Sequence, residues 1–364
     1  MGETSRLLSG YTLILFFLPA WSKSRRLNML GSPRKRGDFQ NALSDFLRLG
    51  EVRKLSQDDA LRIGEQPRLV SRFYDVVTRF YEFGWGATFH FSPRRTGETL
   101  RESQQRHDLA IGELLRLVPG MHVADIGCGV GGPLVTIAPA TGARITGINF
   151  NAHQIRRGED RVRRAGLEGS CAFLYADYMD VPLDEGTFDA LYSFEALSHA
   201  PNRPLAFREL RRLLKPGADA AIVDWCLTDA FDSADGQHSE IRARIERTNA
   251  TPELLTAEEY VEAVQSAGLE IIEAVDQQAE CGNPSTPWYM ALQGRDLSLS
   301  SFARVPAGRA LTAGVTGALE RLGMAPAGTS EAARLLNVAA DALVEAGELG
   351  IFTPSFLVHA RKPA

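Results

Sequence analysis

The chain has 364 residues, of which 44% are hydrophobic and 23% are charged. These proportions are ordinary for a folded globular protein and exclude a chain that is largely disordered. The net charge of -5 leaves no general basic excess, which argues against nucleic acid as a partner.

An apolar run covers residues 11–21 (YTLILFFLPAW), and basic residues follow it between Lys23 and Arg36. The run is too short to span a bilayer, because a transmembrane helix needs about 20 apolar residues. Three interpretations stay open: an anchor lying in a membrane surface, a cleaved targeting peptide, or an untranslated extension ahead of Met29. The first predicts a protein on the cytosolic face of the endoplasmic reticulum or another membrane, and the third a cytoplasmic protein.

Residues 1–66 show no strong periodicity, and we expect them to form an N-terminal extension. Apolar residues then recur at helical spacing and predict a helix over 67–81. A loop rich in glycine and aromatic residues follows at 81–86 (YEFGWG), and a second helix is predicted over 96–117.

Apolar strands and helices alternate in the middle of the chain. The strands are expected over 122–126, 144–149, 171–175, 188–193 and 219–223, and the helices over 134–141, 152–165 and 204–214. This alternation is typical of an α/β sheet with mainly parallel strands and helices on both faces. A capping box at Thr256 and Glu259 opens a further helix that ends at Gly268.

The last two predicted strands, over 269–275 and 355–361, are separated by a long segment. It contains predicted helices over 309–322 and 330–346 and a loop at Pro287-Trp-Tyr289. Insertions of this kind in a sheet are usually functional. We therefore divide the chain into the extension (1–66), a core (67–275) and a C-terminal region (276–364).

The four cysteines, Cys128, Cys171, Cys226 and Cys281, form no CxxC pair, and none has a histidine at zinc-binding spacing. We expect neither a disulfide framework nor a metal site.

In the segment 123–133 (VADIGCGVGGP), Asp125 stands at the end of a predicted strand. Gly127, Gly129 and Gly131 then lead into a helix. Glycines let the backbone turn tightly and approach a ligand closely. Ligands of open α/β sheets bind outside the carboxyl ends of the strands. The spacing fits neither a dinucleotide fingerprint nor a P-loop.

This D-x-G-x-G-x-G pattern resembles motif I of the class I methyltransferases, which have a Rossmann-like sheet of seven strands, mostly parallel, with the last one antiparallel. The resemblance implies that S-adenosyl-L-methionine binds here, with Asp125 facing its ammonium group and Gly127, Cys128, Gly129 and Gly131 around it. It also implies that Asp177 and Tyr178 hold the adenine. After the second strand, where an acidic residue is usual, the chain has Asn149, Asn151 and Gln154.

Further motifs occur in the order found in sterol C-24 methyltransferases. They are YEFGWG at 81–86, HFS at 90–92, NFN at 149–151, FEALSHAP at 194–201 and DWCLTD at 224–229. The C-terminal part is similar at 287–289, 322–326 and 352–354. From about residue 67 onwards the chain therefore resembles this family, which implies methylation of a sterol side-chain alkene. The chain departs from the family pattern at Leu197, Ser198 and Asp224. These departures bear on which sterol is used and which product forms more than on the class of reaction.

The resemblance implies that methyl transfer leaves a carbocation on the sterol side chain. Aromatic faces stabilise cations by about 0.5–2 kcal/mol each. The aromatic candidates for such a pocket are Tyr81, Trp85, Phe89, Phe91, Tyr192, Phe194, Trp225 and Trp288. His90 is a candidate partner for the sterol hydroxyl. Each of these residues also fits an ordinary core or loop position.

The reaction must then remove a proton. Glu195 and His199 are candidate bases because both follow the fourth strand and are four residues apart, and Glu82 is the third candidate beside Tyr81. The alternatives are a helix cap for Glu195 and a structural imidazole for His199. His107 and His153 are predicted to lie on helix surfaces.

The C-terminal helices are expected to form a lid or wall over a flat apolar substrate, or the interface of a homo-oligomer. Two other functions stay open: methyl transfer to another isoprenoid or lipid, such as a tocopherol-type aromatic, and lipid binding without catalysis. The aromatic loop at 81–86 argues against the first, and the complete glycine loop argues against the second.

Overall fold

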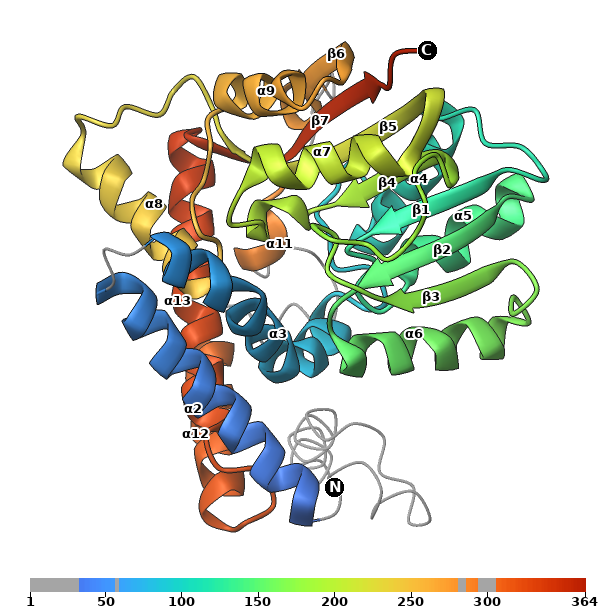
Figure 1. The fold of residues 1–364 in the computed structure, drawn as a ribbon. Helices are drawn as coiled ribbons and strands as arrows, with labels where there is room; N and C mark the ends of the chain where they lie inside the picture. The colour runs from blue at the N-terminus through green and yellow to red at the C-terminus, as the bar shows by residue number, and fades with distance from the viewer. Residues whose placement is uncertain (1–32, 56–58, 281–285, 294–305) are drawn as a thin grey trace, which may run out of the picture.

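The computed structural model describes residues 33–55, 59–280, 286–293 and 306–364 (Figure 1). Its described part contains a sheet of seven strands in the order β3-β2-β1-β4-β5-β7-β6. The strands are β1 (His122–Ile126), β2 (Arg144–Asn149), β3 (Cys171–Tyr175), β4 (Phe188–Phe194), β5 (Leu214–Leu227), β6 (Glu270–Asp276) and β7 (Phe352–Arg361).

Strands β1 to β5 are parallel to one another, whereas β7 runs antiparallel to both of its neighbours, β5 and β6. The predicted seven-stranded fold is thus confirmed. Strand order reverses between β1 and β4, which is where open α/β sheets bind ligands.

Helices cover both faces of the sheet, and each face has its own apolar core. On one face Leu134 and Ile137 pack with Val123 and Ile145. The other face packs Leu210, Tyr260 and Val264 against strands β4 and β5. The helices on the first face are α4 (Leu100–Leu114), α5 (Gly132–Thr141) and α6 (Ala152–Ala165), and those on the second are α7 (Arg203–Leu213) and α9 (Ala257–Ser266).

Side-chain caps set the starts of several helices. The predicted capping box of Thr256 and Glu259 opens α9, and Thr99 with Glu102 forms another at the start of α4. Each box satisfies two backbone N–H groups that the first helical turn leaves without a partner. Short helices α10 (Gln277–Glu280), α11 (Met290–Gln293) and the 3-10 turn η1 (Leu197–His199) complete the connections.

A group of longer helices stands beside the sheet and extends away from it (Figure 1). It contains α2 (Pro33–Leu55), α3 (Asp59–Gly84), α8 (Gly236–Thr248), α12 (Pro306–Arg321) and α13 (Thr329–Leu349). Leu43 and Phe46 of α2, Phe73 and Val77 of α3, and Ala332 of α13 share one apolar cluster.

The start of this group differs from the prediction. Helix α2 was not expected, and α3 begins at Asp59 and continues through Pro67, where the sequence suggested a helix start. Proline removes one backbone hydrogen bond from a helix interior. The adjoining Gln66 is buried, and its amide donates to the backbone oxygen of Ala250 at 2.7 Å.

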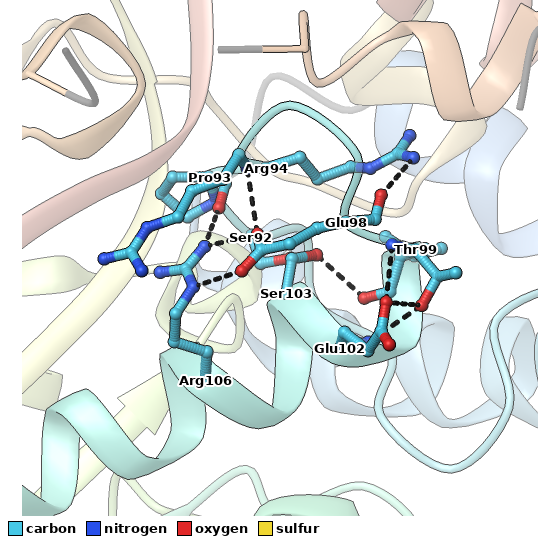
Figure 2. A network of polar contacts seen from close by, with 10 residues as sticks. Ser92, Pro93, Arg94, Glu98, Thr99, Glu102, Ser103 and Arg106 are labelled. Carbon is cyan, nitrogen blue, oxygen red and sulfur yellow. Dashed lines mark hydrogen bonds and ion pairs between the residues drawn. The ribbon is translucent and has the colours of Figure 1, made fainter. Parts of the chain in front are cut away.

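The chain between α3 and α4 is fastened to α4 by a cluster of polar contacts (Figure 2). Arg106 donates from Nε and Nη2 to the two carboxylate oxygens of Glu98 at 2.7 and 2.9 Å, and from Nη2 to the backbone oxygen of Pro93 at 2.5 Å. The hydroxyls of Ser92 and Ser103 are 2.6 Å apart. We call this cluster the Glu98–Arg106 clasp.

None of the helices in the described ranges has the length and apolarity that crossing a membrane requires. Cys128, Cys171 and Cys226 are buried free thiols, whereas Cys281 and the apolar run at 11–21 lie outside the described residues.

Candidate active site

The glycine loop after β1 turns sharply under the start of α5. Gly127 and Gly129 have φ of +69° and +53°, a region that favours glycine. A Cβ on Gly127 would lie 2.2 Å from the Cβ of Ala196, whereas one on Gly129 would meet nothing within 4 Å. Gly127 is therefore required by packing, and Gly129 borders open space in a cavity.

That cavity has a volume of about 300 Å³, at the lower end of the usual range for small-molecule sites. Its lining combines the carboxyl edge of the sheet with helices α3 and α13. Of the predicted cofactor residues, those that line it are Asp125, Gly127, Cys128, Gly129, Asn149, Gln154 and Tyr178.

Asp125 is the penultimate residue of β1 and is 2% exposed. Burial raises the pKa of its carboxyl group well above the usual value. Its Oδ2 atom is buried and finds no hydrogen-bond partner among the described residues. A buried carboxylate oxygen of this kind fits a cationic ligand group, and the ammonium of S-adenosylmethionine matches that need.

The second strand ends in a network of amides. Asn149 donates to the backbone oxygen of Gly129 at 3.2 Å and to the side-chain oxygen of Gln154 at 2.9 Å. Asn151 instead caps α6 and donates to the Ser71 backbone oxygen at 3.0 Å, outside the cavity lining. Its predicted contact with the cofactor is not supported by this position.

Two other predicted cofactor residues also lie outside the lining. Asp177 accepts from the backbone N–H of Met179 at 2.9 Å within its own turn. Gly131, with φ of +73°, forms the N-cap of α5, and a Cβ there would lie 2.8 Å from the ring of Phe173. Its role is to admit the helix beside β3.

Aromatic side chains form much of the remaining wall. Of the predicted aromatic and histidine candidates, those that line the cavity are Tyr81, Trp85, Phe89, His90, Phe91, Phe194 and Trp225. Tyr192 and Trp288 do not line it: Tyr192 is buried behind Phe194 with ring centres 5.8 Å apart, and Trp288 meets the ring of Phe91 edge-on at 5.2 Å. These two predicted substrate residues support the wall rather than form it.

Glu195 follows β4 and holds its carboxyl group at this wall. Its Oε1 accepts from the backbone N–H of Phe91, and its Oε2 accepts from the indole of Trp225 at 2.7 Å. The backbone has φ of +49°, which is rare for a residue with a side chain. Burial raises the pKa of Glu195 to about 8. It is not a helix cap.

His199 lines the same cavity and is paired with a residue that the sequence did not single out as functional. The hydroxyl of Tyr74 lies 3.0 Å from Nε2 of His199. Burial lowers the pKa of His199 to about 4, so the imidazole is neutral near pH 7 and its Nε2 accepts a hydrogen bond from the Tyr74 hydroxyl. In the sequence, Tyr74 stands out only as one of the apolar positions of the helix predicted over 67–81.

Glu82 does not line the cavity. Its carboxylate is paired with the guanidinium groups of Arg157 and Arg161 of α6. Two arginines hold this group as a structural anion, and the geometry does not support Glu82 as a base. Arg157 and Arg161 are far from Glu82 in the sequence, so the residues around Glu82 do not indicate this pairing.

His90 and His107 form a buried pair of rings next to Phe194. His90 lies 2.8 Å from Asp108 and stacks on Phe194 with ring centres 4.2 Å apart. Burial lowers the pKa of His90, but the hydrogen bond to Asp108, the charges of Asp108 and Glu195 and the Phe91 backbone oxygen together raise it, and the net shift is upward. The prediction that His107 lies on a helix surface is wrong: it is 2% exposed and bonded to Gln277 at 2.8 Å.

Two family models match the chain: "Methyltransferase domain" over residues 124–222 and "Sterol methyltransferase C-terminal" over residues 299–364. Cycloartenol-C-24-methyltransferase 1 of Oryza sativa subsp. japonica is 42% identical over 81% of this chain and 85% of its own length. Sterol 24-C-methyltransferase of Eremothecium gossypii is 35% identical over 89% of this chain and 88% of its own length.

Solved structures share the fold at lower identity. Cyclopropane synthase MmaA2 from Mycobacterium tuberculosis has a TM-score of 0.62 at 17% identity, covering 79% of this chain and 95% of that one. Geranyl diphosphate methyltransferase in complex with GPP and sinefungin has a TM-score of 0.60 at 17% identity, covering 82% and 99%.

Proposed function

Because the chain belongs to the sterol 24-C-methyltransferase family, whose members are S-adenosylmethionine-dependent C-methyltransferases, we propose that it methylates C-24 of a sterol whose side chain carries an alkene there. The observation that carries this proposal is the position of Glu195. Its carboxyl group is fixed by Phe91 and Trp225 at the aromatic wall, in the same cavity as the glycine loop.

The cofactor half of the cavity binds the methyl donor. Asp125 would pair with its ammonium group, the open space beside Gly129 would admit its methionine part, and Asn149, Gln154 and Tyr178 would border the nucleoside. Once bound, S-adenosylmethionine supplies an electrophilic methyl group on a positively charged sulfur.

The aromatic half serves the cation that an alkene becomes when it accepts a methyl group. Tyr81, Trp85 and Phe91 present ring faces or edges within one connected cluster, with centres 6.4 Å apart for Tyr81 and Trp85 and 5.6 Å for Trp85 and Phe91. Such rings attract a cation and exclude water that would trap it. Preorganised groups of this kind are the main source of transition-state stabilisation in most enzymes.

Glu195 is the group that removes the proton. An ionised carboxylate first stabilises the nearby cation and then accepts a proton from it, which regenerates a neutral alkene. The neutral imidazole of His199, held by Tyr74, is the second basic group of the cavity. We assign it a supporting role because its basicity is low.

Helix α13 forms the opposite wall, with Leu336, Ala340 and Leu343 in the lining. This apolar surface suits the flat ring system of a sterol, and we propose that α13 is a wall of the substrate site. We also propose that residues 11–21 hold the protein at a membrane surface, where its apolar substrate is concentrated.

The test is to incubate the full chain with S-adenosylmethionine carrying a labelled methyl group and a panel of lipids. The panel contains sterols with and without the side-chain alkene and a tocopherol precursor. We expect label only in the alkene sterols, at C-24 by mass spectrometry. Label in the saturated sterols, or in the tocopherol precursor alone, would contradict the proposal.

A further inference from the structure

The cavity continues from the aromatic wall into the helical group. There it is lined by apolar side chains of α3 and α13, including Val70, Phe73, Leu336, Ala340 and Leu343. A sterol that brings its side chain to Glu195 must place its ring system among these helices, because the sheet edge is taken by the cofactor. A sterol has one hydroxyl group, at the end of the rings opposite the side chain, and that group needs a partner when it is buried.

Two asparagine side chains interrupt this apolar lining. Asn249 follows α8, is 3% exposed, and donates from Nδ2 to the Ile245 backbone oxygen at 2.9 Å and to the Thr248 hydroxyl at 3.2 Å. No group in the described part of the chain donates to its Oδ1 atom. Asn337 on α13 is half-buried, and its amide makes no side-chain hydrogen bond to any described residue.

The two helices that carry these amides pack against each other in opposite directions. Arg244 of α8 pairs with Glu345 of α13. Ile241, in the first half of α8, shares a cluster with Ala346 near the end of α13. Ala250, just after α8, shares another cluster with Ala332 near the start of α13. Asn249 and Asn337 therefore lie toward the same end of the helix pair, and both line the cavity.

Several other polar groups of the cavity already have partners or belong to the cofactor half. The Tyr74 hydroxyl is bonded to His199, and Asn149 is bonded to Gln154. Glu195 is held by Phe91 and Trp225. Asn249 offers an acceptor and Asn337 offers a donor, which are the two partners that one hydroxyl can use at once.

We propose that Asn249 and Asn337 bind the hydroxyl of the sterol and thereby select sterols with a free hydroxyl group; the proposal rests on the function proposed above. The hydroxyl donates to Oδ1 of Asn249 and accepts from Nδ2 of Asn337. The pair fixes how deeply the rigid ring system enters, and so sets where the side-chain alkene meets the methyl group.

The experiment compares Asn337→Leu, Asn249→Leu and the unaltered protein on an alkene sterol with a free hydroxyl and on its deoxy analogue. We expect each substitution to lower kcat/KM for the hydroxyl sterol about tenfold, mainly through KM, as loss of one buried hydrogen bond does. For the deoxy sterol kcat/KM should stay unchanged or rise, so the preference for the hydroxyl disappears.

Val338→Ala is the matched control, because Val338 adjoins Asn337 on α13 but is 42% exposed. Thermal melting and calorimetric affinity for S-adenosylmethionine confirm that each variant is folded. Equal losses on both sterols, or no loss on either in a folded variant, would overturn the role of the two asparagines while leaving the C-24 function intact. If the unaltered protein methylates neither sterol, the proposed function itself fails, and this proposal fails with it.

Discussion

Glu195 is a residue whose local geometry departs from what its type favours. A left-handed backbone costs a residue with a side chain about 1–3 kcal/mol, so it persists only where the surroundings enforce it. The backbone N–H of Glu195 donates to Val223 at 2.7 Å, and its carboxyl group accepts from Phe91 and Trp225. These contacts aim the carboxyl group into the cavity.

Glu195→Gln keeps the shape of the side chain and removes its basicity. We expect turnover to fall by about 10²- to 10⁴-fold, the usual contribution of a positioned acid or base, with affinity for S-adenosylmethionine unchanged. Radiolabel transfer and titration calorimetry measure the two quantities. Near-normal turnover would remove Glu195 from the mechanism.

The raised pKa of Glu195 predicts how activity depends on pH. A base must be ionised to act, and burial places its pKa at about 8. We therefore expect kcat/KM of the unaltered protein to rise with pH between 6 and 8 and to level off above about 8. A profile that is flat over this range would show that another group takes the proton.

The sequence predicts the place of a site residue well where a motif defines it. The prediction is poorer where partners distant in the sequence decide the role of the residue. Asp125, Gly127 and Glu195 stand where the motifs indicated, because each lies at or directly after the carboxyl end of a buried strand. His107 and Glu82 do not have the predicted surroundings, because His107 is bonded to Gln277 and Glu82 is paired with an arginine of α6. Asn337 carries no local signal at all, because it lines a cavity whose other walls come from distant parts of the chain.

At the scale of elements, the Glu98–Arg106 clasp ties the chain between α3 and α4 to α4 (Figure 2). The hydrogen bond from Arg106 holds the pKa of Glu98 at about 2, well below its usual value. A lowered pKa in the folded state stabilises the protein above the ordinary pKa of a glutamate, and this stabilisation is lost as the pH falls toward 2.

Glu98→Gln should therefore lower the melting temperature at pH 7 by a few degrees, since a partly exposed ion pair contributes at most about 1 kcal/mol. The difference from the unaltered protein should shrink as the pH falls from about 4.5 toward 2. Glu113→Gln is the control, because Glu113 is exposed on α4, the helix that carries Arg106. Equal melting temperatures for the two variants at pH 7 would show that the clasp is not stabilising.

The strands and the helices of the sheet were predictable, whereas the N-terminal helices were not. Alternating apolar strands and capping residues such as Thr256 are local signals. Helix α2 is rich in charged residues, and its Leu43 and Phe46 find their apolar partners in α3 and α13. A proline inside a helix is rare, so the sequence predicts a helix start at Pro67, whereas α3 continues through it.

At the scale of the whole molecule, the described helices and sheet line the cavity in which we propose that methyl transfer occurs. If the apolar run at 11–21 holds the protein to a membrane, then deleting residues 1–28 should move it from the pellet to the supernatant. Sterol methylation in detergent should persist at a similar rate. Sedimentation with vesicles measures the first effect, and an unchanged pellet fraction would reject the anchor.

Strand β7 lies inside the sheet, between β5 and β6, although it comes after α13 in the chain. During synthesis, β5 and β6 leave the ribosome long before the strand that joins them. Until residue 361 has emerged, each of these strands presents a bare edge that can pair with other chains. The protein thus depends on its final strand to end a period in which the growing polypeptide is prone to aggregate.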